Sequence, residues 1–206
     1  MKNLAASFES LFLIGCLLIQ LAPSIAAHAQ VNHSQTELER VLAGAYQQIG
    51  QTIYYDGAYK KLSYPGGDVA FERGVCTDVV VRAFRNAGID LQVLVHEDMK
   101  AAFNSYPKNW GLKRPDPNID HRRVPNLMKF FKRKGKSKTI TRKGSDYLPG
   151  DIVAWRLPNG LPHIGLVSDK KTTAGNRFRI VHNIGAGTQL EDVLFEFEII
   201  GHYRWF

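Results

Sequence analysis

The strongest hydrophobic pattern in the chain lies between Gly74 and Gly88. Read at helical period, one broad face of this stretch is apolar and the opposite face is polar. The apolar face consists of Cys76, Val79, Val80, Ala83, Phe84 and Ala87. This pattern predicts a buried helix that starts near Cys76 and ends at Gly88, a residue type that suits the left-handed end of a helix.

Three other stretches show helical periodicity. Ser34 followed by Glu37 is a capping box, and apolar residues then recur at helical spacing to residue 50. Residues 90–100 favour a short helix, and residues 124–134 favour another that stops at the following glycine. Residues 106–125 contain four prolines, so we expect an irregular loop there.

The last third of the chain has the character of a β-sheet. The predicted strands are residues 151–156, 163–168, 177–183 and 194–200, with turn-forming residues between them. Consecutive strands with short links indicate an antiparallel meander. Because the predicted helices come first along the chain and the predicted strands follow, we expect an α+β domain.

Residues 1–29 resemble a secretion signal. Lys2 precedes a nearly continuous apolar run at residues 11–21, and residues 27–29 (AHA) fit a small-x-small cleavage site. We therefore expect export to the periplasm or the medium, no stable membrane span, and one domain over residues 30–206. Because cleavage also removes Cys16, Cys76 remains as the single cysteine.

The formal net charge is +8, and residues 122–143 carry ten Lys and Arg side chains without one acid. They belong to a segment of about residues 90–147 that we interpret as a basic insertion. In an exported protein, such a stretch favours cell-wall polymers, lipid head groups or carboxylate-bearing substrates as partners. Nucleic acid is not expected, because no stacking aromatic residues alternate with these charges.

Cys76 and two histidines are the candidates for chemistry. A thiol in the first turn of a helix lies near unpaired N–H groups that favour a thiolate. A symmetric hairpin pairs His163 with His182 and Gly165 with Ile180, which places both imidazoles on one face and leaves room at the glycine for the cysteine helix. The alternative is that both are partly buried histidines bonded to backbone.

Three motifs carry a family resemblance: residues 74–80 (GVCTDVV), 118–127 (NIDHRRVPNL) and 181–185 (VHNIG). They resemble the bacterial DUF1287 family, and the resemblance covers roughly residues 38–204. The order of residues 149–153 (PGDIV), 162–167 (PHIGLV) and 180–182 (IVH) also resembles the NlpC-type, papain-like cysteine peptidases of the cell wall. Those enzymes usually have Asp-Cys-Ser-Gly where this chain has residues 75–78 (VCTD).

The NlpC-type resemblance implies a papain-like fold with N-terminal helices packed on a C-terminal β-meander. It also implies that Cys76 is the nucleophile, His163 the general base and acid, and His182 the group that orients His163. Tyr64 matches a tyrosine that lines the site in that family. The implied function is an exported cysteine hydrolase that cleaves amide bonds in peptidoglycan stem peptides, without a cofactor or a metal.

The loop before the last predicted helix is rich in polar side chains: Asp120, His121, Arg122 and Arg123. An arginine fork recognises carboxylates, which peptidoglycan stem peptides carry, so either arginine is a candidate for holding the substrate. The alternative is a loop whose own Asp and Arg side chains pair with each other.

Three other functions stay open at this stage. A non-catalytic module on the same fold binds the cell wall or a partner protein, and an acyltransferase uses the same first steps as a hydrolase. A zinc peptidase is suggested by His163 with Asp169 and by Glu198 with His202, although no His-Glu-x-x-His motif is present. The sequence leaves the scissile bond and the oligomeric state undetermined.

Overall fold

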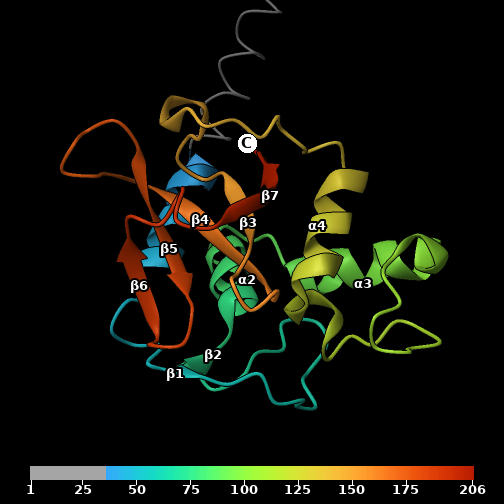
Figure 1. The fold of residues 1–206 in the computed structure, drawn as a ribbon. Helices are drawn as coiled ribbons and strands as arrows, with labels where there is room; N and C mark the ends of the chain where they lie inside the picture. The colour runs from blue at the N-terminus through green and yellow to red at the C-terminus, as the bar shows by residue number, and fades with distance from the viewer. Residues whose placement is uncertain (1–35) are drawn as a thin grey trace, which may run out of the picture.

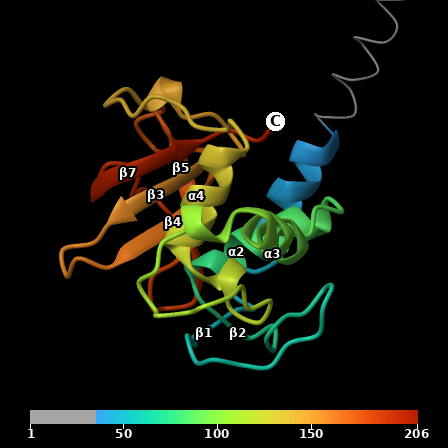
Figure 2. The ribbon, with the colours of Figure 1, turned by 90° about the vertical axis from the view of Figure 1, so that its right-hand side faces the viewer.

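The computed structural model describes residues 36–206, which form a layer of helices against a sheet. In Figure 1, α2 (Cys76–Asn86) lies behind the strands, and α3 (Leu91–Ala102) and α4 (Val124–Arg133) lie to their right. Figure 2 shows the three helices together on one side of the strands. The predicted signal segment and Ser34 lie outside the described residues. Within residues 36–206, no helix is long and apolar enough to cross a membrane.

All the predicted helices are confirmed. The described helical segments are residues 36–46, α2 (Cys76–Asn86), α3 (Leu91–Ala102) and α4 (Val124–Arg133). The 3-10 turns are η1 (Phe103–Ser105), η2 (Asp120–Arg122) and η3 (Gly144–Asp146). The predicted irregular loop therefore contains one short turn, η2, directly before α4.

The main sheet is antiparallel and five-stranded, in the order β6-β5-β4-β3-β7. Its strands are β3 (Ile152–Arg156), β4 (Pro162–Lys171), β5 (Phe178–Asn183), β6 (Thr188–Glu191) and β7 (Glu198–Tyr203). A separate parallel pair consists of β1 (Tyr54–Tyr55) and β2 (Arg73–Gly74). The mixed α and β composition and the antiparallel sheet agree with the sequence, but the last strand does not continue the predicted meander, because β7 pairs with β3.

Two details of the predicted sheet are wrong. Strand β6 was not predicted, and the strand expected at residues 194–200 begins at Glu198. Residues 194–197 form a turn, in which the Glu196 N–H donates to the Val193 carbonyl, and Leu194 packs into the core from that turn. The apolar pattern of residues 194–197 thus predicts burial correctly, but it does not predict the backbone conformation.

The two faces of the sheet belong to different cores. On one face, α2 and α4 pack on residues that include Ile152, Ile164 and Leu166. On the other face, a second cluster is covered by the non-helical segments around Tyr147 and Leu194 rather than by α-helices. It consists of Tyr147, Val153, Trp155, Val167, Ile180 and Leu194.

The predicted register of β4 and β5 is also wrong. Ile180 pairs with Val167 rather than with Gly165, because Phe178 pairs with Lys171 and the register shifts between Val167 and Lys171. The irregularity adds residues to β4 near the turn and moves the pairing by two positions. Since side chains alternate with a period of two, His163 and His182 stay on one face, as diagonal neighbours.

Gly165 lies where β4 and β5 leave no room for a side chain. A Cβ atom there lies 2.7 Å from Ile180 Cγ2 and 3.0 Å from His182 Cβ. We therefore predict that Gly165→Ala lowers the free energy of unfolding by about 1–3 kcal/mol, because the added methyl overpacks a filled site. Urea denaturation measures the change. Gly57→Ala is the control, since a Cβ atom there meets only Val75 Cγ1 at 3.6 Å, and equal stability of the two variants would contradict the prediction.

Candidate active site

Cys76 is the first residue of α2 and is only 4% exposed. The backbone N–H groups of Ile164 and Thr77 and the Tyr55 hydroxyl lie near its sulfur, where they favour a thiolate. The start of the helix is braced by Asp78, whose Oδ2 accepts the Val75 N–H at 2.7 Å. The sulfur is therefore fixed between the helix start and strand β4.

Burial raises the pKa of the Cys76 thiol from 9.0 to about 11, although the N–H groups of Ile164 and Thr77 act in the opposite direction. The helix start lowers the energy of a thiolate, as the sequence suggested, but the loss of water outweighs it. The thiol is therefore neutral at rest, and a base would have to take its proton before the sulfur could act as a nucleophile.

The two histidines form a hydrogen-bonded relay that continues to an acid. His163 Nε2 lies 2.9 Å from His182 Nδ1, and His182 Nε2 lies 2.9 Å from Glu191 Oε2 on β6. The predicted sharing of one face by the two imidazoles is confirmed. Trp155 stacks on the His163 ring from the neighbouring strand, with ring centroids 5.7 Å apart. Both rings are thus held in place by packing and by hydrogen bonds.

Both imidazoles are neutral at physiological pH. Burial, with a smaller contribution from the neighbouring His182, lowers the pKa of His163 to about 3. Burial also lowers the pKa of His182, while Glu191 opposes that shift. A neutral imidazole has one lone pair on a ring nitrogen, which is what a general base requires.

Cys76 and His163 line one cavity of about 660 Å³ at the end of the sheet. No hydrogen bond joins the sulfur to His163 within residues 36–206, and His163 Nε2 is already bonded to His182, so Nδ1 is the nitrogen left for the thiol. Helix α2 packs on the side of Ile164 and Leu166, whereas the imidazole lies on the Trp155 side. Cys76 approaches the strand at the N–H of Ile164, and both side chains line the same cavity.

This arrangement differs from the expected packing at Gly165. The space above that glycine is filled by Ile180 and His182, not by the cysteine helix. The glycine serves the approach of the two strands, and therefore the contact between the two histidines. The opening for a substrate lies instead beside the turn between β3 and β4, where Leu157, Asn159 and Leu161 line the cavity.

Tyr64 lies apart from this cavity. Its hydroxyl donates to Glu97 Oε1 at 3.0 Å and its ring contacts His96 edge to face, with centroids 5.1 Å apart. The tyrosines that line the cavity are Tyr55 and Tyr59. A tyrosine near the sulfur is therefore present, but Tyr55 lies nine residues before the tyrosine that the resemblance implied.

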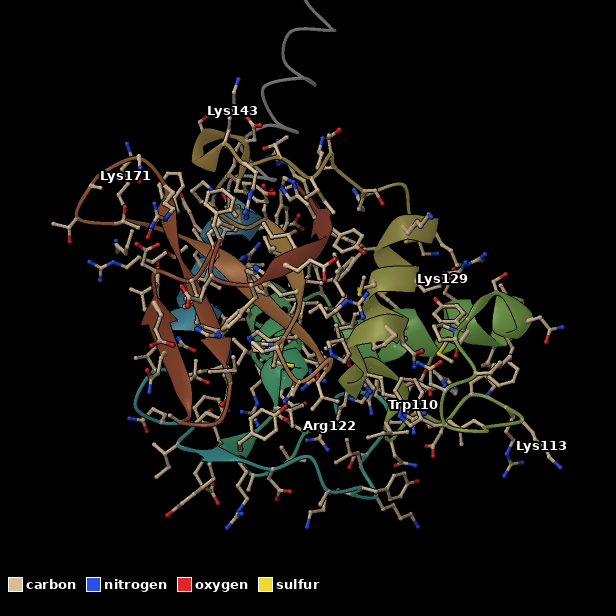
Figure 3. The ribbon with its side chains drawn as sticks, viewed as in Figure 1. Trp110, Lys113, Arg122, Lys129, Lys143 and Lys171 are labelled. Atoms are coloured by element: carbon tan, nitrogen blue, oxygen red, sulfur yellow. The ribbon has the colours of Figure 1, made fainter. Side chains whose placement is uncertain are left out.

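The two neighbouring arginines have different roles. Arg122 forms a bidentate ion pair with Asp78, with both N–O distances 2.9 Å, and donates to the carbonyls of Asp56 and Ala58. Its guanidinium is committed to the protein. Arg123 lies over the Trp110 ring, 4.1 Å from the centroid, and lines the cavity. Figure 3 shows Arg122 and Trp110 on the same side of the molecule, below α4, while Lys143 lies at the opposite end.

Asp120 and His121 are buried and are not among the residues that line the cavity. Burial raises the pKa of Asp120 to about 6, and burial with the nearby Arg122 lowers the pKa of His121 to about 4. The Asp120 side chain accepts the Asp116 N–H. Both residues therefore shape the loop that carries the arginines rather than face a substrate.

The residue pairs behind the zinc alternative have other partners. Asp169 accepts a hydrogen bond from Tyr46, Glu198 pairs with Arg156, and His202 binds Asp151. Among the residues that the structure describes, no group of three or more His, Cys, Asp and Glu side chains is arranged to hold a metal ion. Within the described residues, these two pairs therefore form no zinc site.

Sequence reasoning missed Glu191 and Tyr55. Glu191 lies on the unpredicted strand β6, where His182 pairs with Gln189 and the next residue on the same face is Glu191. Its signal was the short polar and apolar alternation after Gly187. Tyr55 lies in a tyrosine-rich stretch, and nothing in the spacing singled it out from its neighbours.

The neutral thiol leads to a prediction for alkylation. A pKa of about 11 instead of 9.0 lowers the thiolate fraction at pH 7 about 100-fold. The rate of Cys76 alkylation by iodoacetamide should therefore rise about tenfold for each pH unit between pH 7 and pH 10, as followed by peptide mass mapping. The same protein in urea is the control, because its exposed thiol titrates normally. A folded-state rate already constant at pH 7 would show a preformed thiolate instead.

Comparison with known proteins identifies the family. The family described as "Domain of unknown function (DUF1287)" matches residues 42–205. A relative, "Uncharacterized protein YijF" of Escherichia coli (strain K12), is 60% identical over 163 residues, which cover 79% of this chain and 79% of the relative. Cys76, His163, His182 and Glu191 all lie within the matched range. The chain therefore belongs to the DUF1287 family, as its motifs predicted.

Proposed function

We propose that this protein is a thiol hydrolase that cleaves amide bonds through an acyl intermediate on Cys76. The observation that carries the proposal is the convergence on one cavity of a helix-start thiol and a buried His163 that is hydrogen-bonded to His182. A nucleophile, a base and a group that orients the base are the parts that covalent acyl transfer requires.

The order of these parts supports a relationship to the NlpC-type, papain-like enzymes. The thiol starts a helix, the first histidine begins a strand, and the second histidine lies on the next strand of the same antiparallel sheet. On this basis we propose peptidoglycan stem peptides as substrates. The predicted signal segment fits that assignment, because it directs the chain to the compartment where the cell wall lies.

The hydrogen bonds of the relay define where the base has its lone pair. An ionised Glu191 accepts only, so His182 carries its proton on Nε2 and presents the lone pair of Nδ1 to His163. His163 must then carry its own proton on Nε2, which leaves Nδ1 unprotonated. Glu191 thus sets the tautomers of both rings and leaves the basic nitrogen free for the thiol.

The proposed reaction follows from this arrangement. As the Cys76 sulfur attacks the carbonyl carbon, its proton moves to His163 Nδ1 and the carbonyl oxygen becomes an oxyanion. The backbone N–H of Cys76, in the first turn of the helix, stabilises that oxygen. His163 then gives the proton to the amide nitrogen, the C–N bond breaks, and the amine leaves behind a thioester. Water, deprotonated by His163, releases the acid and restores the thiol.

The direct test compares the mature protein with its Cys76→Ala variant on purified muropeptides, with products followed by mass spectrometry. We expect cleavage by the unaltered protein and a loss of at least about 1,000-fold in the variant. Arg156→Gln, which alters a surface pair with Glu198, is the matched control and should retain activity. Equal product from the unaltered protein and Cys76→Ala would reject the thiol mechanism, and products joined to an added amine would identify acyl transfer.

Glu191→Gln tests the role assigned to the relay. An amide can donate to His182 Nε2 and thereby invert both tautomers, so we expect kcat to fall about 10- to 100-fold with little change in KM. Nitrogen-15 NMR of the ring nitrogens should show that the proton of His163 moves from Nε2. Glu198→Gln is the control for loss of a surface carboxylate. Unchanged kcat together with unchanged ring-nitrogen shifts would remove Glu191 from the mechanism.

A further inference from the structure

Two consecutive arginines line the cavity, but only one of them has its donors filled. The Arg122 side chain is 2% exposed and donates four hydrogen bonds, to Asp78, Asp56 and Ala58. Its position is explained by the fold alone. It ties the start of α2 to the segment that carries Tyr55.

Arg123 has no such explanation. Within the described part of the chain its guanidinium makes no hydrogen bond, and the acid nearest to it is Asp120, with an N–O distance of 3.9 Å. The side chain is 15% exposed, and burial lowers the pKa of the guanidinium. A partly desolvated guanidinium with open donors is costly for a protein to maintain, because water no longer satisfies it fully.

The surroundings hold this guanidinium ready for a ligand. Trp110 lies against it at 4.1 Å from the ring centroid, which orients the planar group and leaves its edges available. Arg123 and Trp110 both line the cavity that contains Cys76 and His163. A group bound at Arg123 and a carbonyl at the sulfur therefore occupy the same cavity.

We infer that Arg123, oriented by Trp110, is a subsite that binds a carboxylate of the substrate. The inference rests on the proposed amide hydrolysis and adds the substrate class: acylated peptides with a free carboxylate near the scissile amide. Binding of that carboxylate would position the amide for attack, so that remote binding energy contributes to the rate.

The neighbouring side chains favour a carboxylate over a phosphate. Of the two arginines that line the cavity, Arg123 is the one whose donors are open. The cavity is also lined by the apolar residues Ile119, Val124 and Pro125. Buried Asp120, 3.9 Å away, repels a dianion more strongly than a monoanion. A planar monoanion matches the guanidinium fork with two parallel hydrogen bonds.

The experiment measures binding without turnover, in the full-length chain carrying Cys76→Ala. Isothermal titration calorimetry compares an N-acetylated stem tripeptide with free carboxylates and the same peptide with its carboxylates converted to carboxamides. We expect the acid to bind more tightly than the amide, and Arg123→Gln to weaken binding of the acid at least tenfold while leaving the amide unchanged. Arg123→Lys should fall between, because it keeps the charge but loses the fork. Arg142→Gln, at an exposed arginine near Phe195 that does not line the cavity, is the control.

Three results would overturn the subsite. They are equal weakening of acid and amide by Arg123→Gln, no effect on either peptide, and no binding of the acid by the parent protein. Should Arg123→Gln not fold by circular dichroism, Arg123→Met and Trp110→Leu address the same contact. The measurement needs no catalysis, so the two proposals can fail separately. Acid-selective binding without any turnover would support the subsite and reject the hydrolase. Turnover of the substrate without acid-selective binding would support the hydrolase and reject the subsite.

Discussion

The buried ion pair between Asp78 and Arg122 joins three segments of the chain at the cavity: the start of α2, the segment around Tyr55, and η2. Asp78 accepts the Val75 N–H and so fixes the start of α2, where Cys76 lies. Arg122 reaches from η2 to that carboxylate and also binds the carbonyls of Asp56 and Ala58, next to Tyr55. Burying two charges is expensive unless their hydrogen bonds are complete, and here the bidentate pair and both carbonyls complete them. One interaction thus aligns Cys76, the tyrosine near its sulfur and the loop that carries Arg123.

The sheet supplies the other half of the site by a different physical route. Gly165 allows β5 to approach β4 until His182 reaches His163, and β6 adds Glu191 to the outer end of the relay. Because these groups are buried, neither the thiol nor the imidazoles are charged at rest, as the pKa of about 11 for Cys76 and of about 3 for His163 indicate. Without a substrate, such a site holds no reactive thiolate. In the proposed reaction, proton transfer begins only when a carbonyl lies against the sulfur.

Periodicity in the sequence was sufficient for the elements with strong amphipathic character. Helix α2 and its buried face follow directly from the spacing of apolar residues, and the alternation on β4 and β5 predicted that His163 and His182 share a face. That prediction survived an error of two residues in register, since the side-chain period is two. The short strand β6 was missed because four residues with mixed character give too little pattern, and Glu191 was missed with it.

Other features depend on contacts that no local pattern encodes. Arg122 and Arg123 are adjacent and chemically identical, so their separation into a structural and an open guanidinium appears only when Asp78 and Trp110 are in place. The same holds for Tyr55, one of several tyrosines in its stretch, and for the thiol, whose helix-start environment predicted a thiolate before the extent of burial was known. In each case, a long-range contact or the loss of water outweighs the local preference.

The most direct test of the account is to observe the intermediate itself. The mature protein is mixed with a stem-peptide substrate, quenched in acid within milliseconds to seconds, and analysed by intact and peptide mass spectrometry. The account predicts a transient adduct with the mass of the acyl fragment on Cys76, labile to hydroxylamine as a thioester is. Product formation with no acyl adduct on Cys76 at any time, or with an adduct on another residue, would contradict it.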